Sequence, residues 1–119
     1  LMSNRALGYV PDLRLHPLPL YLREGIPVSL NTDDRGTLQS SLTDEYFAAV
    51  SLFDLSWPEV VRIGRWSLEF SFAEPELKAT LLARYDERVR EFEQKYSGPD
   101  WKRKLALVRL DPRRKLPTF

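Results

Sequence analysis

The sequence predicts an α/β chain that is largely helical when taken alone. Apolar residues alternate at positions 26, 28 and 30, which is the period of a β-strand, whereas from Ser40 onward apolar residues recur at helical spacing. The length of 119 residues and the hydrophobic content of 43% suit one modest domain with a core of its own. A single convincing strand and several helices cannot close a sheet, so we expect residues outside this chain to complete the fold.

The composition excludes several classes of partner and site. Eighteen basic and seventeen acidic residues leave a formal charge of +1, so no net field attracts nucleic acid or an anionic membrane surface. The absence of cysteine excludes disulfides and thiolate metal sites, and no apolar run is long enough to span a bilayer. The chain opens without an initiator methionine at position 1 and without a signal-peptide pattern, which predicts an interior segment of a longer polypeptide.

The first elements are predicted to be a loop and a short helix. Residues 1–15 have the pattern of a loop after the end of a strand, and residues 16–24 that of a helix. Pro17 suits the first turn of this helix, where the missing amide hydrogen costs little, although Pro19 strains the assignment. Gly25 stands where such a helix would end.

A strand is predicted next, over residues 26–31. Its second residue, Pro27, confines it to a strand start or to the edge of a sheet. Helical periodicity then begins, and the first long helix is predicted over residues 42–53, with Ser41 or Thr43 as its N-cap. Acidic residues in the first turn of this helix suit the positive end of its dipole.

The following helix boundary is the firmest in the sequence. Ser56 and Glu59 have the spacing of a capping box, and apolar residues flank them at the positions of a hydrophobic staple, so a helix is predicted from Ser56 to about Phe70. A third long helix follows Pro75. Its apolar stripe is predicted to be core and consists of Leu77, Leu81, Leu82, Tyr85, Val89, Phe92 and Tyr96.

The last part of the chain, residues 97–119, is a basic tail. Its lysines and arginines outnumber its two aspartates, but Trp101 is the only aromatic residue placed among them before the C-terminal Phe119. This pattern favours a solvated surface segment over an arm that binds phosphate groups.

Two adjacent carboxylates, Asp33 and Asp34, follow the predicted strand and precede Gly36. One interpretation is a turn, because Asp and Gly are common turn residues. The other is chemical. Folds of the α/β class gather functional groups at the carboxyl ends of their strands, and successive side chains point to different sides, so one carboxylate would bind a metal and the other a substrate. Both interpretations are open on the residues alone.

The chain cannot complete a catalytic zinc site by itself. Such a site usually takes three protein ligands and a water molecule, whereas this sequence has one histidine and no cysteine. The histidine, His16, begins a predicted helix beside Pro17, which favours a capping or packing role over metal ligation.

Three stretches of the sequence carry a resemblance to a known family. In order and spacing, "HPLPLYLREGIPVSLNTDD", "SLTDEYFAAV" and "LSWPEVVRIGRWSLEFSFAE" together resemble the C-terminal quarter of the adenosine deaminase family. The resemblance runs from about Ser3 to about Tyr96, and the Asn-Thr-Asp-Asp step is its most specific part. The family is similar to other metal-dependent amidohydrolases, which favours the chemical interpretation of the two aspartates.

The resemblance implies a fold and a domain organisation. It implies that the chain is the C-terminal fragment of a (β/α)8 TIM barrel, with residues 1–4 at the end of strand seven and residues 26–31 as strand eight. The helices after Leu42 would pack outside the barrel. Residues 1–96 would be the C-terminal part of the barrel and residues 97–119 a tail that the resemblance does not cover.

The resemblance also implies a chemistry. By position, Asp33 looks like the family's catalytic aspartate, which ligates zinc and contacts the metal-bound water, and Asp34 looks like the aspartate that hydrogen-bonds N7 of the purine. The implied reaction is hydrolytic deamination of adenosine or a related purine nucleoside, with addition at C6 and loss of ammonia. Zinc is the implied cofactor, since it lowers the pKa of bound water.

The other residues of the family's site would lie upstream of Leu1. They are the paired histidines of the first strand, a later zinc histidine, a catalytic histidine and a glutamate, so the missing N-terminal portion of the barrel is the expected partner of this chain. The sequence also departs from the family in detail, because Arg35-Gly36 replaces the proline that many members have after the aspartate pair. Arg35 either contacts a ribose or phosphate substituent or is a solvated loop residue.

Two other hypotheses remain open on the sequence. In one, the segment is a non-catalytic helical interaction module that buries its apolar faces against a partner. In the other, the barrel is complete but inactive, having kept Asp33 while losing upstream ligands. The first predicts that the isolated chain is folded and monomeric, whereas a quarter of a barrel exposes large apolar patches and aggregates.

Overall fold

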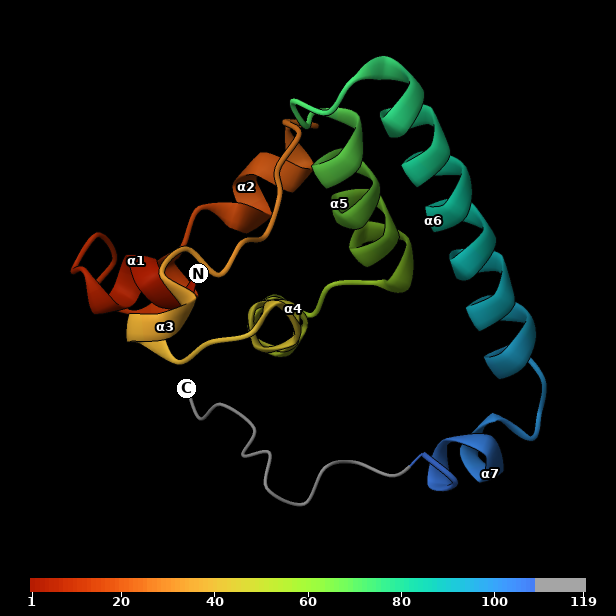
Figure 1. Cartoon of the computed structure of the whole chain (residues 1–119). Coiled ribbons are helices and arrows are strands. Elements are labelled where there is room, and N and C mark those ends of the chain that lie inside the picture. Colours follow the sequence, from red (N-terminus) through yellow and green to blue (C-terminus); the bar gives the residue numbers. More distant parts are fainter. Residues whose placement is uncertain (109–119) are drawn as a thin grey trace. The chain divides into compact units, whose positions relative to one another are not determined.

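The computed structural model describes residues 1–108, which form two compact units, one over Leu1–Phe70 and one that begins at Ser71 (Figure 1). The first unit contains α1 (Met2–Ala6), a 3-10 helix (Leu13–Leu15), α2 (Leu18–Arg23), α3 (Arg35–Leu38), α4 (Leu42–Phe53) and α5 (Trp57–Glu69). The second contains α6 (Pro75–Tyr96) and α7 (Trp101–Ala106). The second half of the basic tail, residues 109–119, lies outside the described residues.

The largely helical character of the chain is confirmed, but both predicted strand segments are wrong for the described residues. Residues 26–31 form no strand. Residues 1–4, expected to end a strand, instead enter α1, where the Leu7 amide donates to the Ser3 carbonyl at 2.8 Å. A strand satisfies its backbone groups only through a neighbouring strand, and residues 1–108 contain none. Residues 1–108 therefore do not show the expected barrel geometry.

Helix α2 is shorter than the predicted residues 16–24, because it begins only after Pro17, at Leu18, and ends at Arg23. Pro17 is the N-cap rather than a residue of the first turn, and Pro19 occupies the first turn, where no amide hydrogen is needed. The predicted stop at Gly25 is confirmed. Gly25 has a φ of +69°, and the next amide, of Ile26, donates to the Tyr21 carbonyl at 2.9 Å, which closes the helix end.

The two long helices of the first unit begin at capping boxes. In α4 the Ser41 amide donates to Asp44 Oδ2 at 2.8 Å, and the Asp44 amide donates to Ser41 Oγ at 3.3 Å. In α5 the Ser56 amide donates to Glu59 Oε2 at 2.8 Å. Both boxes satisfy amides that a helix start leaves without partners. The predicted boundaries of α4 are confirmed, and of its two candidate N-caps the structure selects Ser41.

The hydrophobic core lies in the first unit. It joins the N-terminal segment to α2, to the residues before Asp33 and to α4 and α5. Ile63 of α5 is its largest completely buried apolar side chain. The members of this core are Leu1, Leu13, Leu18, Leu22, Leu30, Ala48, Ala49, Leu55 and Ile63.

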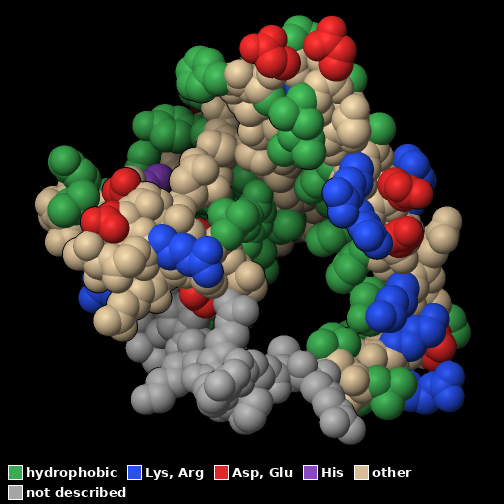
Figure 2. Space-filling model, in the orientation of Figure 1, with side chains coloured by type: hydrophobic (Ala, Val, Ile, Leu, Met, Phe, Trp, Pro, Cys, Tyr) green, Lys and Arg blue, Asp and Glu red, His purple; other side chains and the backbone are tan. Residues whose placement is uncertain are grey.

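The apolar stripe of α6, predicted as core, is not buried. No residue of α6 is buried, and the exposed fraction is 53% for Leu77 and 47% for Phe92. Within its own unit α6 contacts the six-residue α7, which is too short to cover a 22-residue helix. Figure 2 shows hydrophobic side chains open at the surface of the described residues. None of the helices in residues 1–108 combines the length and hydropathy that a membrane span requires.

Candidate functional site

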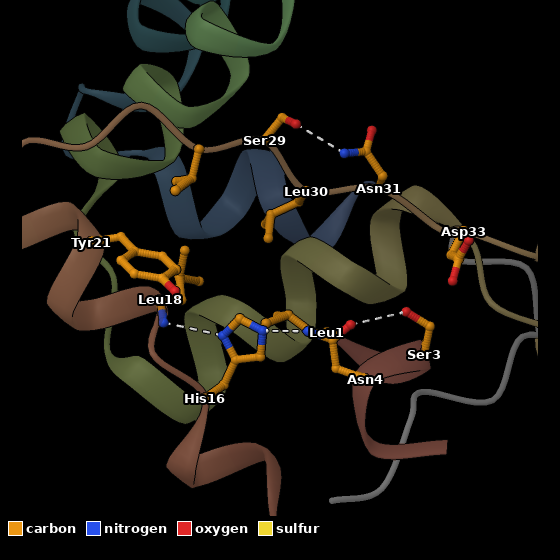
Figure 3. A pocket seen from close by; sticks show the side chains of 11 residues that line it. Leu1, Ser3, Asn4, His16, Leu18, Tyr21, Ser29, Leu30, Asn31 and Asp33 are labelled. Carbon is orange, nitrogen blue, oxygen red and sulfur yellow. Dashed lines mark hydrogen bonds between the residues drawn. The ribbon is translucent and has the colours of Figure 1, made fainter. Parts of the chain in front are cut away.

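An open pocket of about 370 Å³ lies in the first unit, between three segments that are distant in sequence. Residues 1–4 form one wall, residues 16–21 a second, and residues 28–33 a third (Figure 3). Besides leucines and a valine, the pocket carries the polar side chains of Ser3, Asn4, His16, Tyr21, Ser29, Asn31 and Asp33. A small number of convergent polar groups in an otherwise apolar cavity is typical of a ligand site.

Asp33 lies at the edge of this pocket, and its backbone has an unusual conformation. Its φ is +55°, in the left-handed region that most L-residues avoid and that Asp and Asn tolerate best. Asp33 also lines a second open pocket, of about 550 Å³, together with Arg35 and Tyr46. Side chains held in sparsely populated backbone conformations cluster at functional sites. The carboxylate of Asp33 is exposed and therefore accessible to a ligand.

Asp34, in contrast, caps a helix. Its Oδ1 accepts a hydrogen bond of 3.4 Å from the amide of Thr37, so Asp34 caps α3. Hydrogen bonds from Thr37, first from its side chain and then from its backbone, hold the pKa of Asp34 below its ordinary value. Asp34 lines neither of the two pockets that Asp33 borders. The structure therefore places the two adjacent carboxylates in different surroundings, but not through the strand alternation that the sequence predicted, because residues 26–31 form no strand.

His16 caps a helix, as the sequence predicted. Its Nδ1 accepts a hydrogen bond of 3.1 Å from the Leu18 amide at the start of α2, and its Nε2 lies 2.9 Å from the side-chain amide of Asn4. Burial is the main cause that lowers the pKa of His16, and the positive amino group of Leu1 lowers it further. The negative charge of Glu45 raises this pKa, but by less. A neutral ring suits this position, because a proton on Nδ1 would face the proton of the Leu18 amide.

Sequence reasoning missed Glu45, which is completely buried in the first turn of α4. Its Oε2 accepts hydrogen bonds from the backbone nitrogens of Leu1 at 2.7 Å and of Met2 at 3.2 Å, whereas Oε1 has no hydrogen-bond partner. The helix start accounts for a favourable charge at this position. Only the fold reveals that this carboxylate lies inside, beneath the segment that forms one wall of the pocket.

A metal ion would need ligands beyond this part of the chain. Residues 1–108 contain no group of three histidine, aspartate or glutamate side chains that could hold one. Asp33 is the acidic side chain of the pocket, and His16 uses both ring nitrogens within the protein. Arg35, the first residue of α3, is exposed and lines the second pocket beside Asp33.

The residues that line this pocket lie in a part of the chain that is similar to known proteins. The family model described as "Adenosine deaminase" matches residues 1–88. An adenine deaminase of Zymomonas mobilis is 37% identical over 91 residues, which cover 76% of this chain and 27% of that protein. An adenosine deaminase of Clostridium acetobutylicum is 36% identical over 84 residues, which cover 71% of this chain and 25% of that protein. The chain thus spans about a quarter of the length of these relatives. No solved structure matches it.

Proposed function

Because the chain belongs to the adenosine deaminase family, we propose that it supplies one part of the active site of a zinc-dependent hydrolytic deaminase. The substrate is a 6-aminopurine, either adenosine or a related nucleoside or the free base, since both adenosine and adenine deaminases are among its relatives. The position of Asp33 carries the proposal. It lies within the matched residues, it lines the pocket, and its carboxylate is exposed.

The residues present fit a share of a zinc site. A carboxylate oxygen is an ordinary zinc ligand, and a catalytic zinc takes about three protein ligands and keeps one position for water. Asp33 would hold the ion from this chain, and the remaining ligands would come from the portion of the polypeptide that the relatives have in addition. When bound, zinc lowers the pKa of a water molecule and so provides a nucleophile near neutral pH. Water adds across the C6=N1 double bond of the purine, with the hydroxyl on C6 and the proton on N1, and the exocyclic C6–N bond then breaks to release ammonia.

Asp34 would orient the purine. N7 of a purine accepts hydrogen bonds, and an ionised carboxylate only accepts, so a hydrogen bond between them requires a proton on the Asp34 carboxyl. The cap that Asp34 makes with Thr37 lowers its pKa and opposes this proton. The proposed contact therefore requires the pKa of Asp34 to rise when the purine displaces water from the site, as burial of a carboxyl does.

The test uses the polypeptide that carries these residues in the cell. We expect it to release ammonia from adenosine or from adenine, to lose this activity when a chelator removes the metal, and to regain it with zinc. Asp33→Asn should abolish the zinc-supported activity. Asp12→Asn is the matched control, because Asp12 is a carboxylate outside the pocket that caps the 3-10 helix, a task that Asn also performs. An inactive, zinc-free polypeptide would instead support a non-catalytic relative or an interaction module.

A further inference from the structure

One wall of the pocket is held from two sides by side chains that the proposed chemistry does not use. This wall is the segment of residues 1–4, which contributes Leu1, Ser3 and Asn4 to the cavity. The segment lies across the pocket from residues 28–33, which end at Asp33 (Figure 3). Its placement therefore decides the width of the cavity beside that carboxylate.

The backbone of the wall is held by Glu45. The carboxylate of Glu45, on α4, accepts hydrogen bonds from the backbone nitrogens of Leu1 and Met2. Leu1 carries an amino group in this chain and would carry an amide in a polypeptide that continues upstream, and both donate a hydrogen bond. A completely buried carboxylate is costly unless its hydrogen bonds are made, so these two bonds tie the segment firmly to α4.

His16 holds the side chain of Asn4, which belongs to this wall. The Leu18 amide is a fixed donor, so Nδ1 of His16 must be the unprotonated nitrogen and Nε2 must carry the proton of the neutral ring. Nε2–H then needs an acceptor, whereas the atom at 2.9 Å from it is Asn4 Nδ2, which is a donor. Because the oxygen and nitrogen of an amide are assigned from the hydrogen-bond network, this tautomer requires the Asn4 amide to be turned by about 180°, with Oδ1 facing His16. Ser3 Oγ donates to Asn4 Oδ1 at 3.4 Å in the structure, and turning the amide replaces this contact by one in which Asn4 Nδ2 donates to Ser3 Oγ. A single tautomer of His16 thus sets the order of donors and acceptors along this wall.

We propose that His16 is a positioning residue that acts through Asn4 to fix the wall of the pocket opposite Asp33, while Glu45 holds the backbone of the same segment. Of the charged groups that act on His16, Glu45 belongs to the fold, whereas the Leu1 amino group is present only where a chain begins at Leu1. This inference rests on the proposed function, because the wall affects catalysis only if the pocket receives the purine. The tautomer that we expect for His16 does not depend on the proposed function.

Two substitutions separate positioning from capping. Asn at position 16 places a polar atom where Nδ1 lies and can cap α2, but it is too short to reach Asn4. Gln at position 16 reaches Asn4 with a donor where Nε2 lies, but it caps poorly. We therefore expect His16→Asn to keep the cap of α2 and to raise KM, by about fivefold if the whole energy of the lost His16–Asn4 hydrogen bond acts on the placement of the wall, with kcat within about twofold. We expect His16→Gln to lose stability and to keep KM. Arg14→Gln, on the exposed side of the 3-10 helix, should change neither.

The measurements are steady-state kinetics with the purine substrate and 15N spectra of the histidine rings in the complete polypeptide, with the His16 signals assigned by their loss in His16→Gln. We expect a protonated Nε2 and an unprotonated Nδ1 at neutral pH. The opposite tautomer, or a KM that does not change in His16→Asn, would overturn the inference. A wild-type polypeptide with the expected ring signals and no deaminase activity would instead refute the proposed function. It would also refute the proposed effect of the wall on catalysis.

Discussion

Two substitutions at Asp33, to Ala and to Asn, distinguish its effect on stability from its effect on catalysis. The residue has a φ of +55°, a conformation that costs most L-residues about 1 kcal/mol or more, whereas Asn and Asp reach it with little strain. Asp33→Ala should therefore lower the free energy of unfolding by about 1 kcal/mol. Asp33→Asn should leave it within about 0.5 kcal/mol of the wild type. Both variants lack the carboxylate, so both should lose zinc-supported deamination if Asp33 is a zinc ligand.

The chain contains a matched control for this experiment. Asp54, at the C-terminal end of α4, has a φ of +51°, is exposed, and lines neither pocket that Asp33 borders. Asp54→Ala should cost about the same stability as Asp33→Ala, because the backbone strain is alike, and should leave activity unchanged. The assays are urea denaturation followed by circular dichroism, zinc content of the purified protein, and ammonia release.

The outcomes refute different parts of the reasoning. Equal stability of Asp33→Ala and Asp33→Asn would show that the left-handed backbone of Asp33 does not persist in the complete polypeptide. Wild-type activity and zinc content in Asp33→Asn would remove Asp33 from the metal site. Activity lost in Asp33→Ala and Asp54→Ala alike would attribute the loss to instability rather than to the missing ligand.

Three further predictions concern the first unit. Ile63→Ala should lower the free energy of unfolding by about 2 to 5 kcal/mol, because Ile63 is completely buried, and the exposed Leu7→Ala should change it by less than about 0.5 kcal/mol in the same denaturation series. Ser56→Ala should cost about 1 kcal/mol by removing the N-cap of α5, and a melting temperature equal to that of the wild type would contradict this. The fold lowers the pKa of His16 from its ordinary value of 6.5, so below that pH the folded state binds fewer protons than the unfolded state. The free energy of unfolding should therefore be highest above pH 6.5 and should decrease as the pH falls toward the folded pKa. Denaturation at about pH 7.5 and about pH 5.5 should show that loss in the wild type and a smaller one in His16→Asn, which has no group titrating at that position.

Local sequence patterns were sufficient to predict the long helices. The starts of α4 and α5 depend on capping boxes within four residues, at Ser41 and Ser56, and the end of α2 depends on Gly25, so each boundary is decided by neighbours along the chain. The cap formed by His16 was predictable for the same reason, since its partner in α2 is two residues away.

Features that depend on distant partners were not predictable in this way. The alternation of residues 26–31 is a correct pattern for a strand, yet a strand requires a second strand, and residues 1–108 provide none. The stripe of α6 is a correct pattern for a buried face, but burial depends on what covers it. The separation of Asp33 and Asp34 was predicted from strand alternation, which residues 26–31 do not have, and the cap that occupies Asp34 was not predicted, because α3 itself was not.

The sequence alone determined the family, the long helices and the two carboxylates that deserve testing, because caps, periodicity and a contiguous motif are all written in neighbouring residues. Only the tertiary structure decided that Glu45 is buried beneath residues 1 and 2, that His16 meets Asn4, and that Asp33 borders a pocket while Asp34 does not. Each of these facts joins residues that are far apart in the chain or depends on a backbone angle. Packing selects such contacts, since a buried carboxylate or imidazole is stable only where distant donors and acceptors satisfy it.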